Sequence, residues 1–332
     1  MSKLRVGVLG TSGHFVKRII LPLSASEKVE ITGIASRTSD KARQLSEKWH
    51  IPWAYESYEA MLSDPVIEAV YIPLPNHMHL EWMKKAADAG KHILCEKPFA
   101  MNAEEALEAI RYVEGKGLKV METFMYRFHP KWNRVRELVR YNEIGHIMTV
   151  HSLFTYTNLD PGNIRNIQAF GGGALMDIGC YAVSSICEVM GRGPERVVGT
   201  MQLHPDFGTD LLTSGILDFG DAKGLFTVST GSFAQQEVTI VGTDGVIMVR
   251  IPYNDFNDVK AELVVRNALG ARTVEFEPVN QYRLMFEHFA DAVRQDFEPM
   301  VTLNDSLRNM LIMDALRQSA NGKGWIKIKQ PV

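Results

Sequence analysis

The first 122 residues of this 332-residue chain alternate short apolar runs with segments of helical periodicity. A short apolar run bounded by turn residues indicates a buried strand. Strands that alternate with helices over short connections are typical of a parallel, doubly wound sheet. We therefore predict an α/β Rossmann domain over residues 1–122. The expected strands are 4–9, 29–35, 68–72, 93–94 and 118–121, and the expected helices are 14–24, 40–49, 77–89 and 103–116, with Ser39 and Asn76 as caps and Gly90 as a helix end.

The pattern changes after residue 122, where long segments alternate with period two. Such segments, joined by turns like the one at 243–245, indicate antiparallel strands. We predict an α+β domain over 123–332 with a large, mainly antiparallel open sheet, whose final helix is free to pack back on the first domain. The expected strands are 147–157, 196–203, 211–219, 224–232, 237–241, 246–251, 261–266 and 325–329, and the expected helices are 131–141, 174–190, 281–294 and 306–320.

The composition is that of an ordinary globular protein, with 45% hydrophobic and 23% charged residues and a formal net charge of −3. This balance gives no reason to expect nucleic acid or an anionic membrane as a partner. The chain starts at once with a strand, so we expect no signal peptide, and we expect no bilayer-spanning stretch. The three cysteines lie on apolar segments and predict buried free thiols in a reducing, cytoplasmic compartment. No metal site is expected.

A glycine-containing turn follows the first expected strand. A strand, a glycine-rich loop and a helix in succession form the usual setting for a bound pyrophosphate. The motif is degraded, because Ser12 and Phe15 stand where the dinucleotide fingerprint has its second and third glycines. A dinucleotide loop and a plain tight turn both remain open on this evidence. The residues concerned are Gly10, Thr11, Ser12, Gly13, His14 and Phe15.

The end of the second strand indicates which dinucleotide is bound. An NAD site usually has an acid there, which holds the ribose 2′-hydroxyl, whereas a 2′-phosphate needs a cation and small donors. This chain has Ser36, Arg37 and Thr38 and no acid. Arg37 can fork onto a phosphate, and the two hydroxyls can donate to it. We therefore predict NADP(H) in preference to NAD(H).

Two further strands end in residues that predict a site at the same sheet edge, where ligands of open α/β sheets bind. The third strand leads into Leu74-Pro75-Asn76, with His79 soon after, and the fourth ends in Glu96-Lys97-Pro98. Asn76 can cap a helix and contact a cofactor at once. We expect the ammonium group of Lys97 at this edge, where folds of this kind carry out their chemistry.

A second cluster of polar residues follows Gly171-Gly172-Gly173. Asp177 and Tyr181 are four residues apart on the expected helix and share one face. A carboxylate on a mostly apolar helix is costly unless it is paired or solvated. Together with Lys97, this acid and this phenol indicate proton transfer to or from a substrate hydroxyl. Tyr181 as a core aromatic is the structural alternative.

The assembled motifs resemble the glucose–fructose oxidoreductase / inositol dehydrogenase (Gfo/Idh/MocA) family over essentially the whole chain. The resemblance is carried by Glu96-Lys97-Pro98, by the segments 124–130 and 163–165, and by 171–181. Many members have His where this chain has Tyr181. That departure resembles the subgroup with glucose–fructose oxidoreductase, NADP-dependent D-xylose dehydrogenase, dimeric dihydrodiol dehydrogenase and sugar 3-ketoreductases.

The resemblance implies an NADP(H)-dependent oxidoreductase that acts on a sugar or related polyol, with a non-sugar diol as an alternative substrate. A catalytically silent dinucleotide sensor is the rival function. Tyr181 is the expected general acid/base, Lys97 its partner, and Asp177 the group that orients substrate hydroxyls or Lys97. A cis Lys97–Pro98 peptide and a homodimer or homotetramer through the C-terminal sheet are also expected. The expected cofactor contacts are Gly10, Thr11, Ser12, Gly13, His14, Phe15, Ser36, Arg37, Thr38, Leu74, Pro75, Asn76, His79, Glu96, Lys97 and Arg165, and the expected substrate contacts are Tyr126, Arg127, His129, Asp177 and Tyr181.

Overall fold

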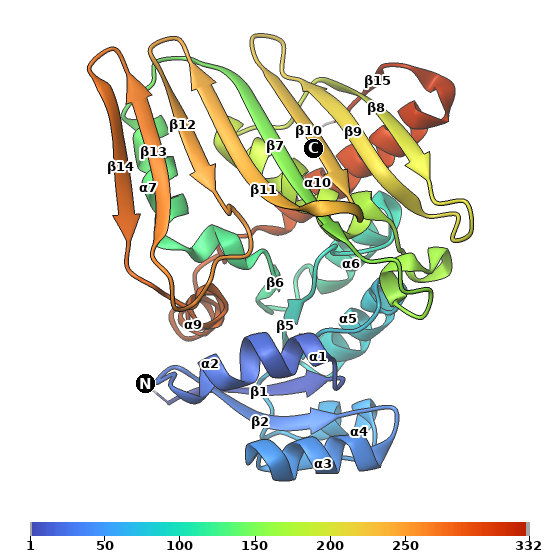
Figure 1. The fold of residues 1–332 in the computed structure, drawn as a ribbon. Helices are drawn as coiled ribbons and strands as arrows, with labels where there is room; N and C mark the ends of the chain where they lie inside the picture. The colour runs from blue at the N-terminus through green and yellow to red at the C-terminus, as the bar shows by residue number, and fades with distance from the viewer. Residues whose placement is uncertain (1, 330–332) are drawn as a thin grey trace. The chain divides into compact units, whose positions relative to one another are not determined.

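The structure, a computed structural model, describes residues 2–329 apart from the side chains of His14 and Lys17. It divides into two compact units, each built on one sheet (Figure 1). The first unit comprises residues up to 125 and residues 280–306, and the second comprises residues 126–279 and those from 307 onward. The expected division after residue 122 did not include the return of 280–306.

The first unit contains a six-stranded parallel sheet in the order β3-β2-β1-β4-β5-β6. This confirms the predicted Rossmann fold. The chain builds the sheet outward from β1, first to one side and then to the other, so a topological switch point lies between β1 and β4. The strands are β1 Leu4–Leu9, β2 Val29–Ala35, β3 Trp53–Tyr55, β4 Ala69–Ile72, β5 His92–Cys95 and β6 Val120–Glu122, and the main helices are α3 Ser39–Trp49, α4 Tyr58–Ser63, α5 His79–Asp88 and α6 Ala103–Val113.

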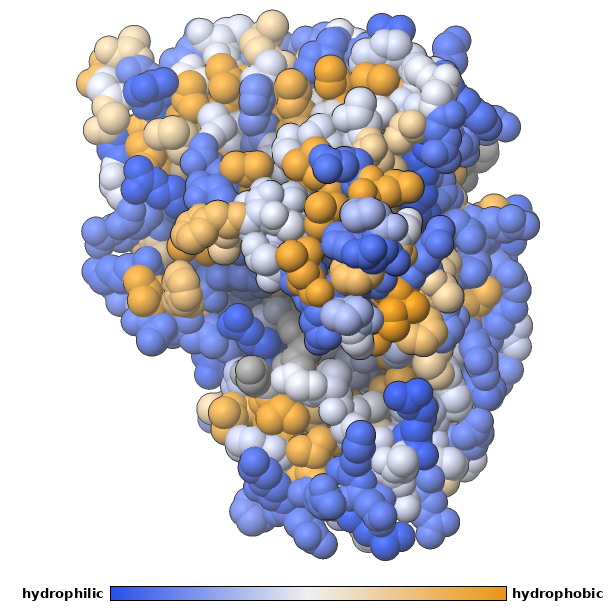
Figure 2. Space-filling view, turned by 45° about the vertical axis from the view of Figure 1, so that its right-hand side comes forward, coloured by the Kyte–Doolittle hydropathy of each residue, from blue (hydrophilic) through white to orange (hydrophobic). Residues whose placement is uncertain are grey.

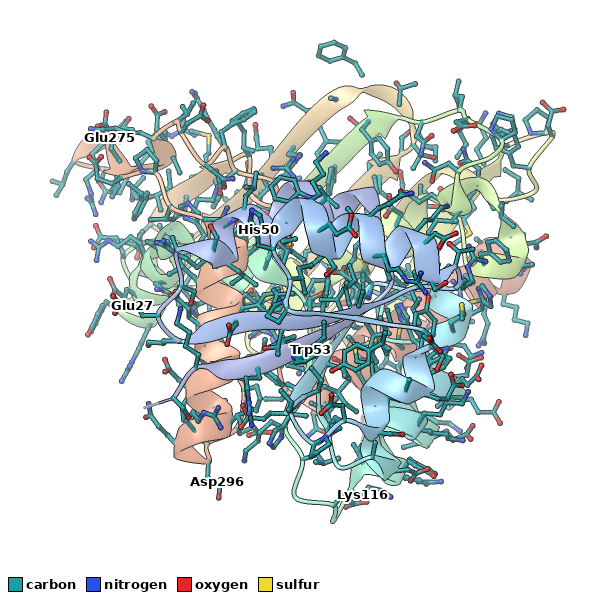
Figure 3. All side chains as sticks on the ribbon, turned by 90° about the horizontal axis from the view of Figure 1, so that it is seen from below. Glu27, His50, Trp53, Lys116, Glu275 and Asp296 are labelled. Atoms are coloured by element: carbon teal, nitrogen blue, oxygen red, sulfur yellow. The ribbon has the colours of Figure 1, made fainter. Side chains whose placement is uncertain are left out.

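The returning helix α9, Gln281–Gln295, is part of this first unit. Phe286 packs edge-on against Tyr71 of β4, with 5.3 Å between the ring centroids. Arg294 forks onto Glu68 just before β4, with both N–O distances at 2.8 Å. Figure 3 shows this unit from below, with Asp296 at the end of α9 and Trp53 on the edge strand β3.

The first helical region is continuous but irregular. It consists of α1 Gly13–Phe15, a π-helical turn Val16–Ile20 and α2 Leu21–Ser24. Pro22 has no N–H to donate to the carbonyl four residues earlier, and a widened turn is one way for a helix to accommodate this. The predicted cap Ser39 is wrong, because Ser39 is already the first residue of α3 and Thr38 takes the cap position.

The second unit contains a nine-stranded mixed sheet in the order β14-β13-β12-β11-β7-β10-β9-β8-β15. All neighbours are antiparallel except β7 and β10, so the predicted large, mainly antiparallel sheet is confirmed. The predicted strand 224–232 is instead two strands that turn at Thr230. The strands are β7 Ile147–Thr157, β8 Arg196–Leu203, β9 Asp210–Asp218, β10 Lys223–Ser229, β11 Gly231–Gly242, β12 Gly245–Arg250, β13 Ala261–Asn267, β14 Gly270–Phe276 and β15 Ile326–Lys327.

Helices cover one face of this sheet. The main ones are α7 Pro130–Arg140, α8 Cys180–Met190 and α10 Leu303–Gln318. A Cβ on Gly215 of β9 would lie 2.5 Å from the Phe226 ring and 2.8 Å from a Leu316 methyl of α10, so any larger residue there would force these side chains to shift. Along β10 the side chains alternate between buried residues on the helix side and half-exposed residues on the open side. In Figure 2 apolar and polar residues are intermixed over the sheet region.

One helical stretch is apolar enough to be mistaken for a membrane span. By length and composition 168–190 could cross a bilayer, contrary to the expectation from the sequence. Within the structure 78% of its most apolar window is buried. Its hydrophobicity is therefore explained by core packing. The three cysteines are buried free thiols, as predicted.

Candidate functional site

In the first unit, the loop after β1 lies against the end of β2. The Gly10 amide donates to the Ala35 carbonyl at 2.8 Å. Gly10 has a φ of +128°, a backbone angle that residues with a side chain rarely adopt. The hydroxyls of Thr11 and Ser36 are 3.4 Å apart. The loop and the residues that follow β2 therefore form one polar surface at the switch point. This arrangement fits a dinucleotide phosphate group.

The two residues that depart from the glycine fingerprint have structural roles. The Ser12 hydroxyl accepts a hydrogen bond from the Phe15 amide at 3.2 Å and caps α1. The Phe15 ring is fully buried, 6.4 Å from the ring of Tyr71. Phe15 thus has no accessible surface for its predicted cofactor contact. The side chain of His14 lies outside the described residues.

The residues after β2 are accessible in part. Ser36 is buried beside Thr11, whereas Arg37 and Thr38 are exposed. An exposed guanidinium next to two hydroxyls is the donor set that a 2′-phosphate requires. Nothing in this segment supplies the acid that an NAD site uses.

His79 is the clearest difference from the expected cofactor contacts. It is fully buried, with Nδ1 at 3.0 Å from the Pro98 carbonyl and Nε2 at 2.9 Å from the Leu74 carbonyl. Burial lowers the pKa of this imidazole, although both carbonyls favour its charged form. The side chain therefore links the turns that follow β4 and β5, and it has no surface for a ligand.

The predicted cap Asn76 is also wrong, since it lies inside a 3₁₀ turn ahead of α5 and no side chain caps either helix.

Glu96, Lys97 and Pro98 follow β5 at the same edge of the sheet. The Tyr71 hydroxyl donates to Glu96 at 2.6 Å, and the Lys97 amide lies 3.3 Å from the other oxygen of that carboxylate. Lys97 is half-buried. The predicted cis peptide between Lys97 and Pro98 is confirmed.

A buried acid that the sequence analysis did not single out ends β6. Glu122 is 1% exposed and pairs in register with Cys95 of β5. The Ser306 hydroxyl and the Phe99 amide lie near its carboxyl without a well-aligned hydrogen bond. Burial, reinforced by Asp305 and Glu96, raises the pKa of Glu122 to about 8. Its position at the end of an apolar strand was the available signal.

In the second unit, Asp177 lies on a π-helical turn, Leu175–Gly179, that leads into α8. Arg165 Nε donates to Asp177 Oδ1 at 2.9 Å, and the Tyr156 hydroxyl donates to Oδ2 at 2.5 Å. The charge of Asp177 raises the pKa of Arg165, while burial first and Asp177 second raise that of Tyr156. Asp177 is thus a paired, hydrogen-bonded carboxylate. Tyr156, on β7, was not predicted.

The three-glycine run holds Arg165 next to the Asp177 helix. A Cβ on Gly172 would lie 2.4 Å from the Arg165 carbonyl oxygen, and the Gly173 amide donates to that same oxygen at 2.8 Å. The Leu175 amide then donates to the Asp210 carboxylate at 2.7 Å. These contacts fix the glycine run in one conformation.

Tyr181 lies one turn after Asp177 and is 6% exposed. Its ring is 6.0 Å from Tyr126, 5.9 Å from Phe154 and 5.4 Å from Tyr253, measured between centroids. Tyr181 also interacts electrostatically with Arg165. The phenol is therefore held in an aromatic cage beside the Arg165–Asp177 pair.

The predicted substrate contacts on segment 124–130 have internal partners. The Tyr126 hydroxyl is 2.8 Å from Ser184 Oγ, and Arg127 Nε is 3.4 Å from Glu188. His129 caps α7 by accepting the Lys131 amide, and burial and Lys131 lower its pKa to about 3. Tyr126 and His129 have at most 1% of their surface exposed. These three residues build the core beneath the site, and contacts to substrate remain predictions for them.

Comparison with known proteins places the whole chain. Residues 4–124 match the Gfo/Idh/MocA oxidoreductase family with an NAD-binding Rossmann fold, and residues 132–248 match the C-terminal domain of that family. The chain belongs to the Gfo/Idh/MocA family. This confirms the predicted family, and the chain is accordingly an oxidoreductase.

Several Gfo/Idh/MocA relatives match this chain over nearly its full length. An uncharacterized oxidoreductase of Rhizobium meliloti is 38% identical over 98% of this chain and 99% of its own. The D-xylose 1-dehydrogenase (NADP(+)) 2 of Haloferax volcanii is 39% identical over 95% and 96%. The crystal structure of a 3-ketoreductase from Actinomadura kijaniata with NADP and TDP-benzene superposes with a TM-score of 0.89 at 28% identity, covering 96% of this chain and 98% of that one.

Proposed function

We propose that this enzyme transfers hydride between NADP(H) and a carbinol or carbonyl carbon of a sugar or related polyol. The observation that carries the proposal is the Asp177 carboxylate, held by Arg165 and Tyr156 one turn from Tyr181. Such a group can accept a hydrogen bond from a substrate hydroxyl while the phenol handles the reacting proton. The xylose dehydrogenase and ketoreductase relatives support a sugar substrate.

The preference for NADP rests on Ser36, Arg37 and Thr38, together with Thr11 beside Ser36. Relatives that use or bind NADP support the same choice. When bound, the dinucleotide supplies or takes up the hydride. The residues of the chain orient the dinucleotide and transfer the proton of the reacting hydroxyl.

Tyr181 is the proposed general acid/base, and Lys97 of the first unit is its proposed partner at the reacting oxygen. A nearby ammonium stabilises the phenolate and so favours proton loss from Tyr181 at neutral pH. Asp177 orients the substrate through a hydroxyl next to the reacting carbon. Arg165 holds the Asp177 carboxylate, and this is the role in the site that we propose for it.

The test is turnover of the purified enzyme with NADP⁺ and NAD⁺ on a panel of aldoses, polyols and a trans-diol. We expect NADPH to form with at least one sugar and more slowly, or not at all, with NAD⁺. Tight NADPH binding without turnover of any compound, in either direction, would instead support the sensor function.

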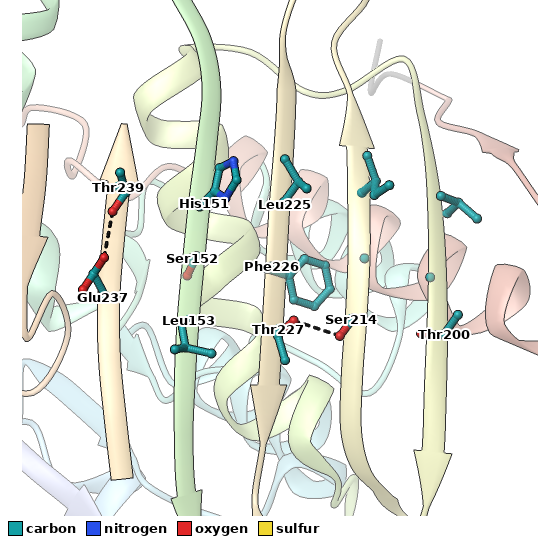
Figure 4. Close-up of a pocket in the computed structure, with 14 residues that line it drawn as sticks. His151, Ser152, Leu153, Thr200, Ser214, Leu225, Phe226, Thr227, Glu237 and Thr239 are labelled. Carbon is teal, nitrogen blue, oxygen red and sulfur yellow. Dashed lines mark hydrogen bonds between the residues drawn. The ribbon is translucent and has the colours of Figure 1, made fainter. Parts of the chain in front are cut away.

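We further propose that the enzyme is a cytoplasmic homodimer in which the open faces of two nine-stranded sheets pack together. That face contains an open hollow of about 540 Å³ lined by side chains of five neighbouring strands (Figure 4). Its apolar members include Leu153, Ile216 and Leu225. Packing across a two-fold axis would bury these residues, and closed two-fold symmetry is the most frequent solution.

Light scattering at micromolar concentration tests the dimer. We expect twice the 37.3 kDa mass of one chain, or four times if a second surface makes a tetramer. Leu225→Glu should shift the mass toward one chain, whereas Glu30→Gln, an exposed change in the first unit, should not. A wild-type mass near that of one chain would contradict the proposal.

A further inference from the structure

Tyr156 lies on the helix-covered face of β7, two residues after the buried Phe154, and beside a bulge in the neighbouring strand β11. Thr155 pairs with Gln235 and Thr157 pairs with Gly231, so the three residues between those partners on β11 lie opposite Tyr156 alone. The hydroxyls of Thr155 and Thr157 donate to carbonyls of this bulge at 2.6 and 2.7 Å. Bulges are frequent next to active sites.

Asp177, whose carboxylate Tyr156 contacts, is 9% exposed. An acid buried to this extent stays ionised only if donors replace water. Arg165 supplies a charge at Oδ1 and Tyr156 a neutral donor at Oδ2, so each oxygen has a partner from a different element. The phenol keeps its proton at working pH, because burial and Asp177 raise the pKa of Tyr156. It is a permanent donor.

We propose that Tyr156 is a positioning residue for this reaction. It holds Asp177 ionised and in one orientation, so that Asp177 accepts a hydroxyl adjacent to the carbon at which Tyr181 acts. The proposal rests on the proposed function and narrows the substrate to compounds with hydroxyls on neighbouring carbons. A simple secondary alcohol lacks the group that Asp177 would bind.

Steady-state kinetics of Tyr156→Phe test the proposal, with Tyr141→Phe as the matched control because Tyr141 is 74% exposed. For a sugar we expect KM to rise and kcat/KM to fall about tenfold or more, the scale of a hydrogen bond to a charged group. For a secondary alcohol without a neighbouring hydroxyl the ratio should change little. The dissociation constant of NADPH should be unchanged. Equal losses on both substrates, or none on the sugar, would overturn the proposal.

A second measurement does not depend on turnover. The Asp177 carboxyl signal, assigned by its loss in Asp177→Asn, is titrated by ¹³C NMR in wild type and in Tyr156→Phe. We expect the midpoint in the variant to be higher by about one pH unit, since the carboxylate loses a donor. An unchanged midpoint would overturn the positioning role. If wild type turns over no sugar, the proposed function fails, and this titration still decides the role of Tyr156.

Discussion

Each unit of the molecule buries one acid at its polar site, and the two acids are held in opposite ways. Glu122, at the end of β6 in the first unit, has other acids rather than a cation near it among the described residues, and a pKa of about 8. Asp177, in the second unit, has Arg165 on one oxygen and Tyr156 on the other. Burial near other acids thus produces a neutral acid, and burial with a cation and a hydroxyl donor produces a fixed charge.

The largest expected effect tests whether the chemistry depends on the charged site. Tyr181→Phe should lower kcat by about 10²–10⁴-fold, the usual contribution of a general acid/base, with NADPH affinity nearly intact. Lys97→Met should lower kcat similarly. The double variant should have a kcat only slightly lower than that of either single variant, because the two residues act together in one proton transfer. Stopped-flow and steady-state assays measure this. Near-full turnover of Tyr181→Phe would move the proton role to another residue.

Glu122→Gln tests the neutral acid. The raised pKa means that the folded state holds a proton that the unfolded chain releases, so the contribution of Glu122 is complete below about pH 4.5 and is lost as the pH rises toward 8. The amide cannot ionise, so the variant should gain stability over wild type across this window, by up to about 5 kcal/mol above pH 8. Urea unfolding at a series of pH values measures the difference. Glu298→Gln, an exposed change in the same unit, should show no such trend. A constant difference between Glu122→Gln and wild type would mean that Glu122 is ionised and paired.

Arg37→Ala tests the nucleotide edge. It should weaken NADP binding by about 1.5–3 kcal/mol, the value of a charge-assisted contact, and leave NAD affinity nearly unchanged. Fluorescence titration with both dinucleotides provides the comparison. Equal losses for both would show that Arg37 does not recognise the 2′-phosphate.

Gly172→Ala tests how rigidly the charged site is held. The new Cβ would lie 2.4 Å from the Arg165 carbonyl, so backbone must shift, at a cost of about 1–3 kcal/mol in stability. Gly162→Ala, where the nearest atom is at 3.4 Å, is the control. Thermal unfolding measures both variants. If the two behave alike, the run 171–173 is as flexible as its composition suggests.

The sequence predicted what depends on local periodicity. β7 and β8 have the predicted bounds, because their alternation reflects one buried face. Edge strands β3 and β14 were missed, since they have no buried face to impose that pattern. Asp177 and Tyr181 were predictable from their spacing on one helix. Tyr156 was not, because its partner lies 21 residues further along the chain, on a different element that no local pattern connects to β7.

The return of α9 to the first unit has a consequence for how the chain is made. Phe286 and Arg294 complete packing around β4, yet they are synthesised after almost the whole of the second unit. The sheet of the first unit is synthesised before α9, so one of its apolar faces stays exposed until residue 295 leaves the ribosome. This exposure favours chaperone binding during synthesis. For the same reason, a gene fragment ending at residue 125 should yield an aggregating product, and a transplant of this unit must include 280–306. The first unit thus begins to be synthesised before the second, but its packing is completed only after most of the second unit has been made.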